Sequence, residues 1–369
     1  MSRALTSPFL AASLRGVACS IALLAVGACG NDSAAPSAPA TPPTAPAALP
    51  ADSAAPPTDP ATPPPDSAML PTDSATPPTD PAAPPTDPTG AALAVLDNRS
   101  ASPGIVFGTW NMPNSYLNSV HTGWMNGGPL DPSNILSWLS GARAKGARGV
   151  IKLCKGNDSY VKNDDGTFSL SKWKALVGRY QNVNLDSYIA DGTILGHLLI
   201  DEPHRADRWG GTAISPATLE AMAKYSRQLW PSMTTMVGEE PRWLASSTTT
   251  YAYLDAAWAQ YTSNKGSVAD WIAAEVSAAK GKGLGLVVGM NVLDGGNGSS
   301  HIAGFSRGKY AMSATEIRSY GSALLAQSYA CGFFNWSLDA VYYGRSDIKS
   351  AMSDMSAKAR AHAKTSCRQ

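Results

Sequence analysis

Between residues 198 and 203 the chain reads Leu198-Leu199-Ile200-Asp201-Glu202-Pro203. An apolar run of strand character leads here directly into two adjacent carboxylates, and a proline then ends it. Carboxylates are rarely buried without a partner or a chemical role. Two of them at the end of a core strand predict acid–base or nucleophilic chemistry at the mouth of an α/β barrel, where strand ends converge on one pocket.

The segments around this one alternate between strands and helices. Apolar and β-branched runs predict strands at 105–110, 149–154, 194–200, 234–238, 256–261, 284–290 and 331–336. Helix starts lie between them: Ser215-Pro216 pairs a capping residue with a proline, and Ser313-Ala314-Thr315-Glu316 has the capping-box pattern. This order predicts a parallel sheet with crossover helices.

The size of the folded part favours a closed barrel. Residues 100–369 are enough for one (β/α)₈ barrel of TIM type, in the α/β class. Seven strands are clear, and we expect the eighth between Tyr180 and Ile194, or an irregular barrel at that point. An open doubly wound sheet is the competing architecture. Polar and aromatic residues at nearly every carboxyl strand end favour the barrel.

The first 28 residues have the anatomy of a bacterial lipoprotein signal peptide. An apolar run from Ile21 to Val26 is followed by small residues and then Cys29. This order resembles a lipobox, which implies a lipid on Cys29. Gly30 rather than Asp in the next position implies the outer membrane or cell surface, if the source is a Gram-negative bacterium. The alternative is an ordinary secretory signal followed by a coincidental cysteine.

Residues 29–99 predict a disordered tether. They are mostly Pro, Ala, Thr, Ser and Asp, and Pro-Pro-Thr-Asp-Pro occurs at 56–60, 77–81 and 84–88. Such a segment cannot bury enough apolar surface to offset its ordering entropy. Proline-rich chains are extended. We therefore expect a lipid-anchored protein of the cell envelope whose folded domain is held away from the membrane.

Charge and motif spacing argue against several classes of ligand. The formal charge of +1 gives no signal for nucleic acid. The glycines of 281–285 precede a strand, so they do not form a phosphate loop after one. Cys154, Cys331 and Cys367 match no zinc pattern, although a Cys331–Cys367 bridge suits an oxidising compartment. We expect a monomer that uses no cofactor and no metal.

The residues at the predicted strand ends have the chemistry of a sugar site. Aromatic rings stack on the apolar faces of sugars, whereas amides and carboxylates hydrogen-bond to hydroxyl groups. Several tryptophans lie at or just after strand ends, and we expect two or three of them in the cleft. The candidate substrate-binding residues are Trp110, Asn111, Asp201, Gln260, Tyr261, Asn291, Trp336 and Asp339.

Asp201-Glu202-Pro203 at a strand end resembles the Asn-Glu-Pro signature of barrel glycoside hydrolases. The resemblance implies that Glu202 is the general acid/base and that a second Glu follows three strands later. If the motif ends the fourth strand, that later position falls near Asn291, and no Glu is there. Asp201 in place of Asn is a further departure, which puts recognition of the substrate 2-hydroxyl in question.

Two acids remain as candidates for the second catalytic carboxylate. Glu239 directly ends an apolar strand, and Asp294 is the acid nearest to Asn291. We rank Glu239 first. The structural alternative for Glu239 is a charge at a helix N-terminus. For Asp201 and Glu202 the alternative is an ion pair with Lys152 or Arg205.

The sequence therefore predicts a surface-tethered glycoside hydrolase that acts on a polysaccharide or glycan. A barrel that binds glycans or serves in adhesion without catalysis is the alternative, and the missing second Glu favours it. A metal-dependent hydrolase is a weaker alternative. The substrate, the linkage and the stereochemical outcome stay open.

Overall fold

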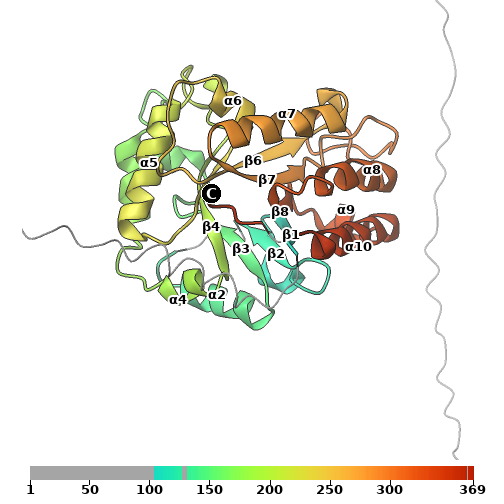
Figure 1. The fold of residues 1–369 in the computed structure, drawn as a ribbon, viewed down its shortest axis with the longest axis horizontal. Helices are drawn as coiled ribbons and strands as arrows, with labels where there is room; N and C mark the ends of the chain where they lie inside the picture. The colour runs from blue at the N-terminus through green and yellow to red at the C-terminus, as the bar shows by residue number, and fades with distance from the viewer. Residues whose placement is uncertain (1–103, 127–130, 364) are drawn as a thin grey trace, which may run out of the picture. The chain divides into compact units, whose positions relative to one another are not determined.

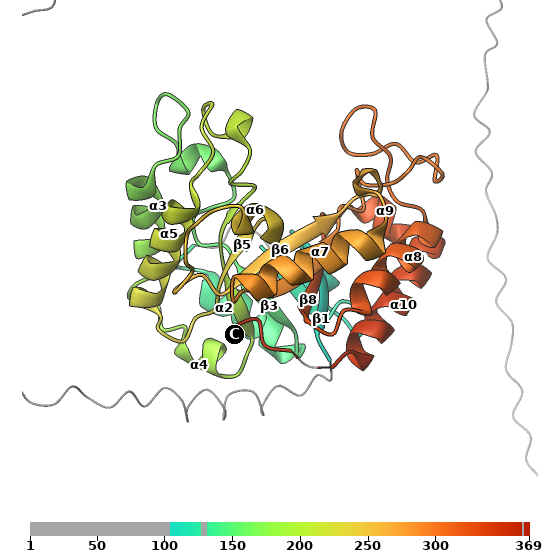
Figure 2. The same cartoon turned by 45° about the horizontal axis from the view of Figure 1, so that its top comes forward.

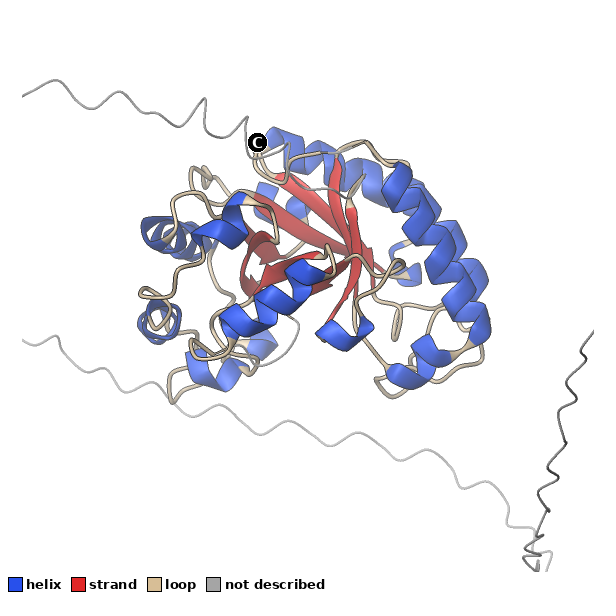
Figure 3. Cartoon of the chain, turned by 90° about the horizontal axis from the view of Figure 1, so that it is seen from below, coloured by secondary structure: helices blue, strands red, loops and turns tan. Residues whose placement is uncertain are grey.

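A computed structural model describes residues 104–126, 131–363 and 365–369. Over these residues the chain forms a closed barrel of eight parallel strands in sequential order (Figure 1). Helices surround the strands, which occupy the centre (Figure 3). The predicted (β/α)₈ barrel is confirmed. The doubly wound alternative is wrong, because β1 pairs with β8 and closes the sheet. The expected signal peptide, Cys29 and the tether lie outside the described residues.

The strands run with their carboxyl ends toward one face of the barrel. They are β1 (Val106–Trp110), β2 (Gly123–Met125), β3 (Arg148–Ile151), β4 (Ile194–Asp201), β5 (Thr235–Gly238), β6 (Ala256–Tyr261), β7 (Gly285–Met290) and β8 (Ala330–Asn335).

The α-helices lie between the strands and after the last one. They are α2 (Ile135–Ala144), α3 (Leu170–Gly178), α4 (Asp186–Ala190), α5 (Pro216–Leu229), α6 (Pro241–Ala245), α7 (Val268–Gly281), α8 (Ala314–Leu325), α9 (Ala340–Gly344) and α10 (Ser346–Ala361). Short 3₁₀ turns are η1 (Asn114–Tyr116), η2 (Asp158–Val161), η3 (Ala206–Arg208) and η4 (Ser263–Lys265).

The expected position of the eighth strand is wrong. The stretch between Tyr180 and Ile194 contains the short helix α4, and the additional strand is β2, earlier in the chain. β2 has only three residues, Gly123–Met125. A strand this short has too few residues for a period-two pattern, so its neighbours β1 and β3 define it instead.

The predicted helix starts are confirmed by their caps. Ser215 accepts a hydrogen bond from the Thr218 N–H, with Pro216 in the first turn of α5. Ser313 and Glu316 form a complete capping box at α8. Each cap satisfies backbone N–H groups that the first helical turn leaves free. These caps set where each crossover helix begins.

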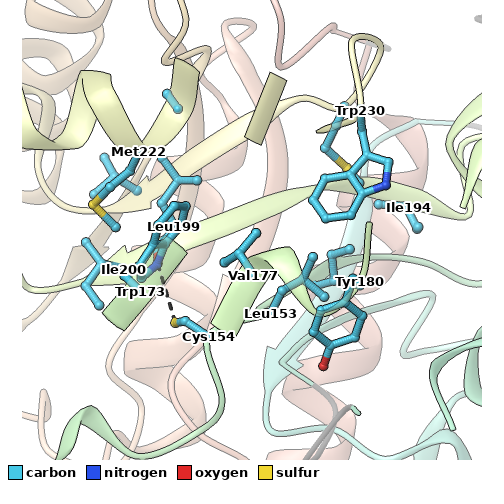
Figure 4. Close-up of a cluster of buried hydrophobic side chains, with 14 of the residues drawn as sticks. Leu153, Cys154, Trp173, Val177, Tyr180, Ile194, Leu199, Ile200, Met222 and Trp230 are labelled. Atoms are coloured by element: carbon cyan, nitrogen blue, oxygen red, sulfur yellow. Dashed lines mark hydrogen bonds between the residues drawn. The ribbon is translucent and has the colours of Figure 1, made fainter. Parts of the chain in front are cut away.

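The apolar core has two layers. Leu198, Met236 and Trp258 belong to a cluster that fills the barrel interior, and other strand residues pack outward against the helices. Figure 4 shows the outer layer at β4, where Leu199 lies beside Trp173 of α3. The Trp173 indole N–H donates to the Leu199 carbonyl at 2.9 Å. Such burial on both faces explains the continuous apolar runs of the strands.

Two further features bear on the predictions. Cys331 and Cys367 form a disulfide, as the sequence suggested, whereas Cys154 is buried and free. Across the described part of the chain, none of the helices combines the length and the apolar character needed to cross a bilayer.

Candidate active site

Each of the loops that follow the first four strands contains a non-glycine residue with left-handed backbone. Asn111, Asn126, Lys155 and Glu202 follow β1 to β4 and have φ of 56°, 50°, 66° and 50°. This conformation is uncommon outside glycine and costs on the order of 1 kcal/mol or more per residue. Such strain is concentrated at functional sites. Glu202, the motif residue predicted to be catalytic, is therefore held at a sharp turn as the chain leaves β4.

The carboxylate of Glu202 is held by two arginines. Its Oε2 accepts from Nη1 of Arg205 at 3.0 Å and from Nη1 of Arg208 at 2.8 Å. Arg208 also lies 3.4 Å from Asp201 and 2.5 Å from Asp158. The sequence analysis considers an ion pair with Arg205. It does not consider Arg208, which contacts Glu202 and two further carboxylates. One half-buried guanidinium thus joins three carboxylates.

Asp201 is the buried member of this group. Burial raises its pKa to about 6, although Arg208 opposes the shift. Its Oδ1 accepts no hydrogen bond and lies against the backbone of Gly238. Lys152 is also buried and points its Nζ toward the Trp110 ring, 5.7 Å from the ring centroid. Asp201 is thus a desolvated acid directly behind Glu202.

Glu239 forms a close pair with His204. The side chain of Glu239 is buried, and its Oε2 lies 2.5 Å from His204 Nδ1. Its Oε1 accepts from the Glu240 N–H at 2.8 Å. The hydrogen bond to Glu239 raises the pKa of His204, against the effect of partial burial. Glu240, not Glu239, is the N-cap residue of α6, so the side chain of Glu239 does not serve as the helix cap.

Glu202 and Glu239 line the same cavity. It has a volume of about 370 Å³ and lies where β4, β5 and β6 end. Two aromatic rings and one amide complete its walls, together with a lysine that pairs with Glu240. We call it the acidic pocket; its lining residues are Glu202, His204, Gly238, Glu239, Glu240, Trp243, Trp258, Gln260 and Lys265.

The other candidate acid, Asp294, lies elsewhere. Its carboxylate accepts from both the N–H and the hydroxyl of Ser306, at 2.8 and 2.6 Å. Its own N–H donates to Asn291 Oδ1 at 2.9 Å. Both residues line a neighbouring cavity of about 490 Å³, which we call the amide pocket; it is formed by Thr262, Ser263, Asn264, Asn291, Asp294, Gly295, Gly296, Asn297, Gly308, Lys309 and Tyr310.

The remaining predicted binding residues divide by the direction of their side chains. Trp110 is buried and stacks on Trp258, with ring centroids 5.4 Å apart and planes 7° from parallel, so it supports the acidic pocket from below. Tyr261 points away from the cavity and packs between Trp271 and Tyr320 outside the barrel. This is the alternation expected after Gln260, which does line the pocket.

Three other predicted residues lie at the mouth but outside the acidic pocket. Asn111 accepts a hydrogen bond from the side-chain amide of Asn126 at 3.0 Å. Trp336, after β8, is half-buried and meets the ring of Phe305 edge-on. Asp339 caps α9 by accepting from the Tyr342 N–H at 2.7 Å. The structure thus gives Asp339 a capping role.

Two residues of the site were not among the candidates from the sequence: His204, which lines the acidic pocket, and Arg208, which binds Glu202. His204 directly follows Pro203, so its place beside the motif was a usable signal. Arg208 carried no such signal, because its three partners come from two different loops. Within residues 104–126, 131–363 and 365–369, no group of three or more His, Cys, Asp or Glu side chains is arranged to hold a metal ion.

Comparisons with known proteins concern the fold. No protein-family model and no curated protein matches the chain. Among solved structures, a GH18 chitinase from Pseudoalteromonas aurantia has 15% identity and a TM-score of 0.40, over 67% of this chain and 97% of the chitinase. An intracellular xylanase from Thermoanaerobacterium saccharolyticum has 13% identity and a TM-score of 0.43, over 63% and 86%. The β-mannanase of Thermomonospora fusca has 14% identity and a TM-score of 0.41, over 63% and 78%. All three are glycoside hydrolases, and the likeness bears on the fold alone.

Proposed function

We propose that this protein is a glycoside hydrolase in which Glu202 and Glu239 form the catalytic carboxylate pair. The observation that carries the proposal is their place in one pocket together with Trp243 and Trp258. Glycosidases cleave their substrates with two carboxyl groups that flank the scissile bond. The half-buried Trp243 offers an indole face on which a sugar can stack, whereas Trp258 is buried against Trp110 and forms part of the wall. The substrate class we propose is a polysaccharide or glycan.

The hydrogen bonds of the two carboxylates support an assignment of their roles. Oε2 of Glu202 faces two guanidinium groups, which only donate, so this oxygen is an acceptor. Oε2 of Glu239 faces Nδ1 of His204, and a proton can move between these two atoms. We therefore assign the proton donor to the pair of Glu239 and His204, and the nucleophile or water-activating base to Glu202. These roles reverse those implied by the resemblance to the Asn-Glu-Pro enzymes.

In this scheme the leaving oxygen takes the proton held by Glu239 and His204 as the glycosidic bond breaks. If Glu202 attacks the anomeric carbon, a covalent glycosyl ester forms, and water that is deprotonated by the pair of Glu239 and His204 then hydrolyses it and frees Glu202. Otherwise Glu202 removes a proton from the water that attacks the anomeric carbon. The net reaction adds one water molecule across the bond. Arg205 and Arg208 orient the Glu202 carboxylate for either role.

A non-catalytic glycan-binding barrel is the second candidate. The specific observation in its favour is Asn291, which follows β7 where the resemblance calls for a Glu. Under this alternative the acidic pocket binds sugar hydroxyls, and no glycosidic bond is cleaved.

Replacement of each carboxylate tests the proposal. Glu202→Gln and Glu239→Gln should each abolish the release of reducing ends from soluble cello-, xylo-, manno- and chito-oligosaccharides, while binding is retained. Asp354→Asn, on the exposed side of α10, is the matched control and should keep full activity. Full activity in either Gln variant would contradict the assignment. Binding without cleavage by the unaltered protein would favour the second candidate, and loss of activity on addition of EDTA would favour a metal-dependent hydrolase.

We also propose that the protein is anchored to the cell envelope by a lipid on Cys29, with residues 29–99 as the tether. The support is the signal-peptide anatomy and the proline-rich composition. Labelling with a radioactive fatty acid should mark the unaltered chain but not Cys29→Ser. Equal labelling of both would contradict the anchor.

A further inference from the structure

The amide pocket lies next to the acidic pocket. The segment that follows β6 borders both: Gln260 and Lys265 line the acidic pocket, whereas Thr262, Ser263 and Asn264 line the amide pocket. The two cavities therefore share one wall at the carboxyl end of β6. A molecule longer than one cavity can extend past this wall into the other.

The lining of the amide pocket is mostly polar, and its charged members are one carboxylate and one lysine, Asp294 and Lys309. Asn264, Asn291 and Asn297 contribute amides, and neighbouring residues contribute hydroxyls. The side-chain oxygens of the three asparagines each accept one hydrogen bond within the protein, from Thr262, Asp294 and Ser299, and each oxygen has a second lone pair. The carboxylate of Asp294 is already engaged by Ser306. Amides and hydroxyls both donate and accept, which matches the hydrogen-bonding needs of sugar hydroxyls. A phosphate or carboxylate ligand would instead call for clustered cations.

Exposed aromatic rings stand at the edge of this pocket. Tyr310 lines it and is 45% exposed, and Phe305 on the same loop is 77% exposed. The loop is closed by a bridge between Ala303 and Tyr310. It rises above the barrel near α9, as the orange loop of Figure 2 shows. A contiguous apolar patch rimmed by polar residues can mark a ligand-binding groove, and these two rings lie beside the polar lining of the pocket.

Hydrogen bonds and a ring contact hold this loop in one conformation in the folded domain. Asp294, in the loop after β7, holds it through two hydrogen bonds from Ser306. The Phe305 ring lies edge-on to Trp336, with centroids 5.6 Å apart. Rigid aromatic groups lose little conformational entropy when a ligand stacks on them.

We propose that the amide pocket is a second sugar subsite, and that the substrate is an oligosaccharide or polysaccharide chain that occupies both pockets. This inference rests on the proposed function, since the acidic pocket is taken as the site of cleavage. It narrows the proposed substrate class to an extended chain that spans both pockets, rather than a single terminal sugar. Tyr310 provides the stacking face, and the asparagine amides bind hydroxyl groups.

Binding without turnover tests the subsite. Full-length protein carrying Glu202→Gln is titrated with cello-, xylo-, manno- and chito-oligosaccharides from disaccharide to hexasaccharide, and affinity is measured by calorimetry. We expect the affinity for the bound series to rise with chain length. Tyr310→Ala in the same background should weaken binding of the hexasaccharide about fivefold to tenfold and leave the disaccharide nearly unchanged.

Tyr188→Ala is the matched control, because Tyr188 lies on α4, which precedes β4 and so sits at the opposite end of the barrel. It should bind every oligosaccharide as the Glu202→Gln parent does. Affinity that does not depend on chain length, or a Tyr310→Ala variant that binds the hexasaccharide as tightly as the parent, would overturn the subsite while leaving the proposed function standing. No binding of any oligosaccharide would overturn both.

Discussion

Nη1 of Arg208 donates to Oε2 of Glu202 across 2.8 Å. The same guanidinium contacts Asp201 at 3.4 Å and Asp158 at 2.5 Å. An arginine suits this position because its planar fork presents several donors at fixed angles. Arg208 therefore both orients Glu202 and compensates the buried charge behind it.

Replacement of Arg208 should cost both stability and activity. Arg208→Ala leaves Asp201 buried beside Glu202 without the guanidinium that offsets their repulsion. We expect a loss of about 2–4 kcal/mol in the free energy of unfolding, measured with urea at neutral pH. We also expect kcat to fall more than tenfold, because Glu202 loses a hydrogen bond that orients it.

Two further variants make this prediction specific. Arg318→Ala removes an exposed ion pair with Asp354, so its cost should stay below about 1 kcal/mol. Arg208→Lys keeps the positive charge but loses the planar fork of donors. Its loss in unfolding free energy should lie between those of Arg208→Ala and Arg318→Ala. If Arg208→Ala is no more damaging than Arg318→Ala, the role assigned to Arg208 is wrong.

The pH dependence of activity should report the pair of His204 and Glu239. Since the pKa of His204 is raised above 6.5, its proton is retained at that pH and lost as the pH rises through the raised value. If this pair is the acid, kcat/KM should decline on the alkaline side above pH 6.5. His204→Gln should move that decline to lower pH, because Glu239 alone must then hold the proton.

His362 at the end of α10 provides the control for the pH profile. The His362 imidazole contacts the backbone carbonyls of Ala363 and Gln327, and neither residue lines the acidic pocket. His362→Gln should therefore leave the pH dependence of kcat/KM unchanged. An alkaline limb that stays in place in His204→Gln would argue against the pair as proton donor.

The pattern of residues predicted the barrel more fully than it predicted the site. Caps such as Ser215 and Ser313 and the apolar strands are local features, and local features are readable in the sequence. β2 was missed because three residues show no periodicity. Gln260 and Tyr261 were both proposed as binding residues, although the alternation of a strand sends neighbouring side chains to opposite faces.

The missed site residues depend on contacts between loops. Arg208 meets Asp158, fifty residues earlier in the chain, and His204 meets Glu239 from the next strand end. The local sequence places His204 beside the motif, but it does not show that Glu239 or Asp158 lies within hydrogen-bonding distance of these residues. Asp294 was a candidate because it is the acid nearest to Asn291, but its bonds to Ser306 emerge only once the loop is folded.

Asp201 should give the unfolding free energy a distinctive pH dependence. Its pKa is about 6 in the folded protein, above the ordinary 3.8, so the folded state binds the proton more tightly. This group therefore makes stability fall as the pH rises from about 4 to about 6. The free energy of unfolding of Asp201→Asn minus that of the parent should therefore increase by roughly 2 kcal/mol from pH 4 to pH 7.

Urea unfolding at several pH values measures this difference. Asp354→Asn, at an exposed position, serves as the control and should differ from the parent by a nearly constant amount. A difference between Asp201→Asn and the parent that does not change with pH would contradict the raised pKa.

The close approach of Gly238 to Asp201 predicts a non-additive pair of substitutions. A Cβ on Gly238 would overlap Oδ1 of Asp201, and the Gly238 carbonyl accepts from the Glu202 N–H at 2.8 Å. Gly238→Ala should therefore lower the free energy of unfolding by about 1–3 kcal/mol and displace Glu202, with a loss of kcat. Gly281→Ala, where a Cβ would meet nothing within 4 Å, should be neutral or slightly stabilising.

A double-mutant cycle identifies the overlap as the cause. Asp201→Ala removes the carboxylate that the new methyl group would strike, so adding Gly238→Ala to it should cost much less than Gly238→Ala costs in the parent. The coupling in unfolding free energy should reach about 1 kcal/mol or more, measured by urea unfolding. Additive costs would mean that the methyl group strains the backbone of β5 itself, and that Asp201 is not what requires glycine there.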